Sequence, residues 1–137
     1  MGGLLTAPVV VVADDLMWST RITEAVRRAG GSAVPLSTAA ELGVALEAYE
    51  LGDVHTISGA VVDLAVRRLD GVAAIERIAG ARLPVIAVAE HDDQLTRKRA
   101  LRAGATRVFS YRKFFEEGTR LVEGWLTADA GPGSAGG

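Results

Sequence analysis

The stretch Ser58-Gly-Ala-Val-Val-Asp63-Leu64 decides the fold, because an apolar run leads directly into a single carboxylate. A continuous apolar run of this kind indicates a strand buried on both faces, as in a parallel sheet. An aspartate at the carboxyl end of such a strand lies where open α/β sheets bind ligands. The alternative is that Asp63 only caps the next turn, since aspartate is common at strand ends.

Strand and helix patterns alternate five times along the chain. Apolar, β-branched runs predict strands over residues 8–15, 32–37, 58–64, 83–89 and 106–111. Apolar residues at helical spacing predict helices over residues 16–29, 38–49, 71–79, 92–103 and 114–126. Alternation at this spacing indicates βαβ units, hence a parallel sheet with helices on both faces. Pro35 cannot donate to a strand ladder, so the strand over residues 32–37 is expected at a sheet edge.

Length and composition narrow the class of protein. The 137 residues fit one domain, and 49% hydrophobic residues suffice for a core. A net charge of -2 gives no general attraction to nucleic acid or anionic membranes. The chain has no cysteine, no apolar stretch of membrane-spanning length and no signal-peptide pattern at its start. We therefore expect a cytoplasmic protein with no membrane partner.

Three carboxylates fall at predicted strand ends. Asp14 and Asp15 follow the first strand and Asp63 ends the third. If these strands are neighbours in a parallel sheet, their ends meet at the topological switch point. Clustered carboxylates repel one another, and a hard divalent cation with oxygen ligands, most plausibly Mg²⁺, relieves the repulsion. Such a cation would make a carboxylate a suitable phosphoryl acceptor; the alternative is a set of solvated acids.

Four motifs together resemble the receiver domain of bacterial two-component response regulators. The motifs are Val12-Ala-Asp14-Asp15, Val62-Asp63-Leu-Ala-Val-Arg-Arg-Leu-Asp70-Gly71, Leu83-Pro-Val-Ile86 and Ala103-Gly104-Ala105. The resemblance spans residues 8–127. Residues 1–7 are then an N-terminal extension, and residues 128–137 a flexible tail rich in Gly and Ala.

The resemblance implies a single-domain, doubly wound flavodoxin-like α/β fold with strand order 2-1-3-4-5. It implies that Asp63 accepts a phosphoryl group from a sensor histidine kinase or phosphotransfer protein. Asp14, Asp15, Asp63 and the backbone carbonyl of Ala65 would hold Mg²⁺. A receiver is a phosphoacceptor rather than an enzyme, with at most self-phosphorylation and autodephosphorylation chemistry.

Two positions depart from the family. Receivers usually carry Thr or Ser at the end of the fourth strand, where this chain has Ala89, and Lys at the end of the fifth, where it has Tyr111. Ala89 donates no hydrogen bond, and Tyr111 donates one but carries no positive charge. Along an extended strand, Lys113 would project to the same side as Tyr111 and could replace the missing ammonium; the alternative is a solvated lysine.

Basic residues gather on the helix, strand and helix that follow the fourth strand, a region that forms the output face of receivers. They are Arg97, Lys98, Arg99, Arg102, Arg107, Arg112 and Lys113. A solvated charged face is the simpler interpretation, and an acidic protein partner the functional one. The absence of interleaved aromatic residues argues against nucleic acid, and the resemblance also admits a homodimer.

The leading hypothesis is a stand-alone, atypical receiver that signals through protein contacts. The second is a pseudo-receiver, a protein interaction module that works without phosphorylation because the hydroxyl and ammonium are lost. A third, a flavodoxin-like cofactor binder, is weaker, since Asp14 and Asp15 occupy the turn where a phosphate would need backbone donors.

Overall fold

The structure is a computed structural model that describes residues 7–130. Its five strands are β1 (Val9–Val12), β2 (Ala33–Leu36), β3 (Gly59–Asp63), β4 (Val85–Ala89) and β5 (Arg107–Ser110). They form one parallel sheet in the order β2-β1-β3-β4-β5. This is the predicted doubly wound, flavodoxin-like arrangement, and it is confirmed. Residues 1–6 and 131–137, which include most of the predicted extension and tail, lie outside the described part.

The sheet is built from the apolar runs identified in the sequence. Every residue of β1, β3 and β4 is buried, as expected for central strands covered on both faces. β2 lies at one edge of the sheet, where Pro35 pairs with Val11 on its only partner strand. The edge position predicted from Pro35 is therefore confirmed.

The helices are α2 (Leu16–Arg28), α3 (Ala39–Glu50), α4 (Gly71–Gly80), α5 (Gln94–Ala103) and α6 (Tyr111–Ala130). Each of the first four begins with a side chain that accepts a hydrogen bond from the first turn: Asp15, Thr38, Asp70 and Asp93. Thr38 and Glu41 form a capping box, the reciprocal pair of hydrogen bonds typical of a helix start. No helix in residues 7–130 is long and apolar enough to cross a membrane.

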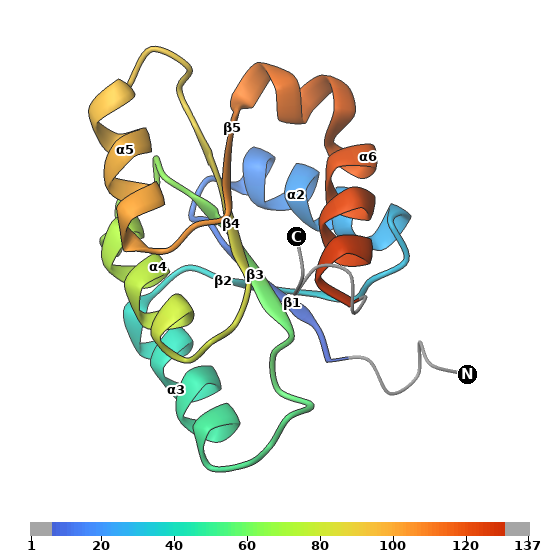
Figure 1. Cartoon of the computed structure of the whole chain (residues 1–137), viewed down its shortest axis with the longest axis vertical. Helices are drawn as coiled ribbons and strands as arrows, with labels where there is room; N and C mark the ends of the chain where they lie inside the picture. Colours follow the sequence, from blue (N-terminus) through green and yellow to red (C-terminus); the bar gives the residue numbers. More distant parts are fainter. Residues whose placement is uncertain (1–6, 131–137) are drawn as a thin grey trace.

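Two helical layers cover the two faces of the sheet. Helices α2 and α6 lie on one face, and α3, α4 and α5 lie on the other (Figure 1). Side chains of β1 alternate between the two cores, because Val9 and Val11 face α2 and α6 whereas Val10 and Val12 face the other layer. The carboxyl ends of the strands thus form a shared edge between the layers.

The end of the chain differs from the sequence-based expectation. β5 ends at Ser110, and Tyr111 is the first residue of α6, whereas we expected a strand through Tyr111 and a helix from Phe114. The helix also extends beyond Leu126 to Ala130, with a non-helical backbone at Glu117. The apolar pattern of Val108 to Tyr111 fits either structure, so the sequence alone does not place this boundary.

Candidate functional site

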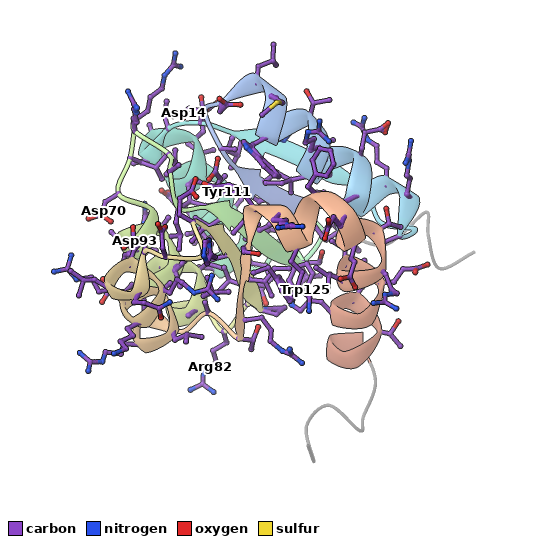
Figure 2. All side chains as sticks on the ribbon, turned by 90° about the horizontal axis from the view of Figure 1, so that it is seen from above. Asp14, Asp70, Arg82, Asp93, Tyr111 and Trp125 are labelled. Atoms are coloured by element: carbon purple, nitrogen blue, oxygen red, sulfur yellow. The ribbon has the colours of Figure 1, made fainter. Side chains whose placement is uncertain are left out.

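A cavity of about 510 Å³ opens at the carboxyl ends of β1 and β3. Asp14, Asp15, Trp18, Asp63, Ala65, Arg67, Arg68, Glu90 and Tyr111 line it. The position matches the crevice at the switch point of a doubly wound sheet, between β1 and β3. Figure 2 looks at the molecule from above and labels Asp14 and Tyr111, which both line this cavity. The structure thus brings the three predicted carboxylates to one cavity.

Asp63 ends β3 and is 1% exposed. Its Oδ1 accepts hydrogen bonds from the Ala65 backbone N–H, at 3.0 Å, and from the hydroxyl of Tyr111. Burial raises the pKa of this carboxyl, against the lowering effect of the two hydrogen bonds. The nearby charges of Asp15 and Asp14 raise the pKa further. Both donors use Oδ1, and within residues 7–130 no hydrogen bond is made to Oδ2.

Asp14 faces the loop between β3 and α4. Its Oδ2 accepts hydrogen bonds from the backbone N–H of Arg67 at 2.8 Å and of Arg68 at 3.0 Å. These bonds lower the pKa of Asp14, the one from Arg67 most, against a smaller effect of burial. The carboxylate is therefore ionised, and it fixes the loop that follows β3.

Asp15 has a structural role that the sequence analysis did not assign. It is the N-cap of α2, and its Oδ1 accepts a hydrogen bond from the Trp18 backbone N–H at 3.0 Å. The residue is exposed, so its second oxygen remains accessible.

The acids fit a hard divalent cation by donor type but are not gathered around one point. The hydrogen bonds described above use one oxygen on each of Asp14, Asp15 and Asp63, which leaves the other for a ligand. Carboxylate and carbonyl oxygens, including that of Ala65, are the donors that Mg²⁺ prefers. Within residues 7–130, however, no three acidic or histidine side chains stand in a metal-holding cluster. Binding a cation here would require the carboxylates to rotate toward it.

Tyr111 closes one side of the cavity. Its hydroxyl donates to Asp63, and its ring lies 4.6 Å from the ring of Trp18 at 47°. Burial raises the pKa of the Tyr111 hydroxyl far above its ordinary range, and the hydrogen bond to Asp63 and that residue's charge add to the shift. The side chain therefore stays neutral and acts as a hydrogen-bond donor at all physiological pH values.

The other predicted switch positions lie apart from the cavity lining. Ala89 ends β4, is 2% exposed and offers only a methyl group. Lys113 is exposed and belongs to α6, so the premise that it follows Tyr111 along an extended strand is wrong. Residues two apart on a helix face different directions. The structure does not place the Lys113 ammonium beside Asp63.

The sequence analysis missed four cavity residues: Trp18, Arg67, Arg68 and Glu90. Trp18 lies one helical turn before the buried Ile22 and packs against the same core, so helical spacing was a usable signal for it. Arg67 and Arg68 act through backbone N–H groups, which carry no sequence signature.

Comparison with solved structures places this fold. A response regulator receiver domain from Rhodospirillum rubrum is similar with a TM-score of 0.69 and 20% identity, covering 88% of this chain and 94% of that one. The receiver domain of sensor histidine kinase PA1611 from Pseudomonas aeruginosa, with magnesium coordinated in its active site cleft, is similar with a TM-score of 0.68 and 21% identity. The match covers 89% of this chain and 98% of that one. The beryllofluoride-activated DrrB receiver domain is similar with a TM-score of 0.68 and 19% identity. The match covers 89% of this chain and 98% of that one.

No protein-family model matches the sequence, and no curated protein matches it either. At the identities of these structures the similarity establishes the architecture. The chain has the fold of response regulator receiver domains.

Proposed function

We propose that this chain is a phosphoacceptor of two-component signalling, with Asp63 as the acceptor. The carrying observation is the placement of Asp63. It is a buried carboxylate at the end of a central strand of a receiver fold, with Oδ1 held by two donors and Oδ2 available to the cavity. The donor would be the phosphohistidine of a sensor histidine kinase or a phosphotransfer protein.

The chemistry is a phosphoryl transfer between two side chains. Asp63 Oδ2 forms a bond to phosphorus while the bond from phosphorus to the donor imidazole nitrogen breaks. The electron pair of that bond remains on the imidazole, which takes up a proton from solvent. Tyr111 and Ala65 orient the acceptor by holding Oδ1. No separate substrate is turned over, so the chain is a signalling acceptor rather than an enzyme, and loss of the phosphoryl group is hydrolysis.

Mg²⁺ is the proposed cofactor. The side chains of Asp14, Asp15 and Asp63 and the carbonyl of Ala65 would hold it, and when bound it would offset negative charge on the phosphoryl oxygens. Arg67 and Arg68 keep the loop carrying Ala65 against Asp14 through their backbone bonds. That constraint supports the proposal because it positions a carbonyl donor beside the acids.

Mass spectrometry after incubation with acetyl phosphate and Mg²⁺ tests the assignment. We expect one added phosphoryl mass, lost in Asp63→Asn and retained in Asp53→Asn, a matched change on an exposed loop. The addition should require Mg²⁺ and be reduced in Asp14→Asn. A protein that takes up no phosphoryl group from acetyl phosphate or phosphoramidate would contradict the proposal.

A phosphorylation-independent interaction module is the second candidate. It is favoured by the methyl group of Ala89 in the switch position, by the neutral Tyr111 in contact with Asp63, and by the dispersed carboxylates. For this candidate, partner binding is unchanged in Asp63→Ala. Partner affinity that increases with acetyl phosphate would rule it out.

The proposed partner surface is the face formed by α5, β5 and α6. Exposed Lys98, Arg99 and Arg102 lie on α5 together with exposed Leu95 and Leu101, which suits an acidic, partly apolar protein surface better than nucleic acid. Arg97 does not belong to this charged surface, because it is half-buried and its Nη2 donates to the Val108 carbonyl at 3.2 Å. A homodimer through the same face and a cytoplasmic location complete the proposal.

A further inference from the structure

Tyr111 contacts Asp63 and Trp18 with opposite ends of one rigid side chain. The hydroxyl donates to Oδ1 of Asp63, and the ring packs on Trp18 in the first turn of α2. Tyr111 is also the first residue of α6. A displacement of the phenol at Asp63 therefore acts directly on the beginnings of two helices.

The bond from Tyr111 to Asp63 depends on the chemical state of Asp63. In the free carboxylate, Oδ1 shares the negative charge and is a strong acceptor. In an acyl phosphate, Oδ1 is a neutral carbonyl oxygen, and the strongest nearby acceptors are the phosphoryl oxygens. The Tyr111 hydroxyl thus has a different preferred partner in the two states, which is the differential interaction that a switch requires.

Helices α2 and α6 are coupled along their length. The guanidinium carbon of Arg21 lies 4.1 Å from the centre of the Phe115 ring. Further along, a Cβ placed on Gly118 would come within 3.4 Å of the Ala25 Cβ, so the two backbones approach closely there. A groove of about 650 Å³, lined by residues of both helices, runs between them. Where the two helices touch, beside this groove, a displacement of one helix moves the other because packed atoms leave little free space.

The other side of the sheet lacks a comparable link. Ala89, at the end of β4, presents a methyl group, which cannot donate a hydrogen bond to a phosphoryl oxygen. Among residues 7–130, no side-chain hydrogen bond joins Asp63 to α5.

We propose that Tyr111 is a positioning residue that transmits the state of Asp63 to the paired helices α2 and α6, through its hydrogen bond to the carboxylate and its ring contact with Trp18. This inference rests on the proposed phosphoacceptor function and extends it. The surface that responds to modification is then the α2–α6 groove, and α5 stays unchanged.

Backbone amide NMR with beryllofluoride and Mg²⁺ tests the proposal. In the unmodified sequence we expect shifts around Asp63 and Ala65 and at reporters on α2 and α6, such as Arg21 and Phe115, with little change at Arg99. In Tyr111→Phe the ring contact with Trp18 is kept and only the hydroxyl is lost. We expect the α2 and α6 shifts to disappear while those near Asp63 remain.

Tyr49→Phe is the matched control, because Tyr49 lies on α3 against the opposite core. It should leave the response unchanged. Shifts on α5 larger than those on α2 and α6, or an α2 and α6 response that persists in Tyr111→Phe, would overturn the proposal.

A second measurement separates this inference from the phosphoacceptor assignment. Without any phosphodonor, Asp63→Ala removes the acceptor of the Tyr111 hydroxyl. The inference predicts amide shifts at Arg21 and Phe115 and altered Trp18 fluorescence, read in a Trp125→Phe background. Changes confined to β3 and β4 would overturn the inference. Failure of beryllofluoride to bind, with this result intact, would contradict the proposed function alone.

Discussion

The two layers that cover the sheet differ in the kind of side chain they contain. The core under α3, α4 and α5 is aliphatic, built from residues such as Leu42, Ile75 and Ile78. The core under α2 and α6 contains Phe109, Phe114 and Trp125, and Trp18 and Tyr111 pack against it. Tyr49 is the only aromatic side chain outside the α2–α6 layer.

The difference matters at Asp63, where one aromatic side chain of the α2–α6 layer reaches the carboxylate. The Tyr111 hydroxyl donates to Asp63, whereas Ala89, at the end of β4, presents only a methyl group. The two layers cover the same sheet, so it is side-chain composition that gives the α2–α6 layer a hydrogen bond to Asp63. The proposed switch acts through this layer.

The largest effect on the free energy of unfolding is expected when a buried side chain of the aromatic core is truncated. Phe114 is 3% exposed and its neighbour Phe115 is 58% exposed. Phe114→Ala should lower the free energy of unfolding by about 3–5 kcal/mol, because it removes buried contacts and leaves a cavity. Phe115→Ala should cost under about 1 kcal/mol, mainly the contact with Arg21. Urea denaturation measures both, and equal effects would refute the assignment of Phe114 to the core.

A smaller effect is expected where α5 meets α4 in the aliphatic layer. Gly104 has φ of 122°, and a Cβ there would lie 2.5 Å from the Ala79 Cβ. Gly104→Ala should therefore cost about 1–3 kcal/mol through overpacking and backbone strain.

Gly80→Ala is the matched change at the end of α4, where a Cβ meets nothing within 4 Å. It should be neutral or stabilise by up to about 1 kcal/mol. Thermal unfolding distinguishes the two. A tolerated Gly104→Ala would show that α4 and α5 pack less tightly than the structure indicates.

A hydroxyl at position 89 should reduce the difference between the two helical layers in their response to a modified Asp63. Ala89→Thr supplies a donor to a phosphoryl oxygen, and a hydrogen bond of about 1.4 kcal/mol shifts a two-state balance roughly tenfold. Beryllofluoride should then shift α5 amides such as Arg99, which are expected to stay silent in the unmodified protein. Ala89→Val, with the same shape and no hydroxyl, should not produce this gain. An equal gain in both variants would indicate a packing effect.

The smallest expected effect concerns the charge of Asp63 and its pH dependence. Burial raises the pKa of Asp63, so the folded state holds its proton more tightly than the unfolded chain does. Stability from this group is therefore fully present below the ordinary carboxyl pKa of about 4 and is lost as pH rises through the raised value.

Asp63→Asn should accordingly raise the free energy of unfolding by about 0.5–2 kcal/mol at neutral pH, with the gain vanishing in acid. The charged neighbours Asp14 and Asp15 act in the same direction. Urea titrations of both proteins across this pH range provide the measurement, with Asp53→Asn as a control on an exposed loop. A gain that is independent of pH would contradict the electrostatic origin.

The sequence by itself determined the sheet, the strand ends and the acids placed on them. Continuous β-branched runs that alternate with helices favour a parallel sheet covered on both faces, and Pro35 favours an edge position for β2. The helix predicted to end at residue 103 does end there, and Gly104 follows it with a positive φ. These features follow from local patterns, which is why they could be predicted.

Only the tertiary structure decided how the cavity is lined. The helix start at Tyr111 points Lys113 elsewhere and brings the phenol to Asp63, a contact between residues 48 positions apart. Asp14 accepts hydrogen bonds from the backbone N–H groups of Arg67 and Arg68, which lie 53 and 54 positions away along the chain. Such contacts depend on the packing of distant segments and on side-chain rotation at a strand end, and no local pattern encodes either.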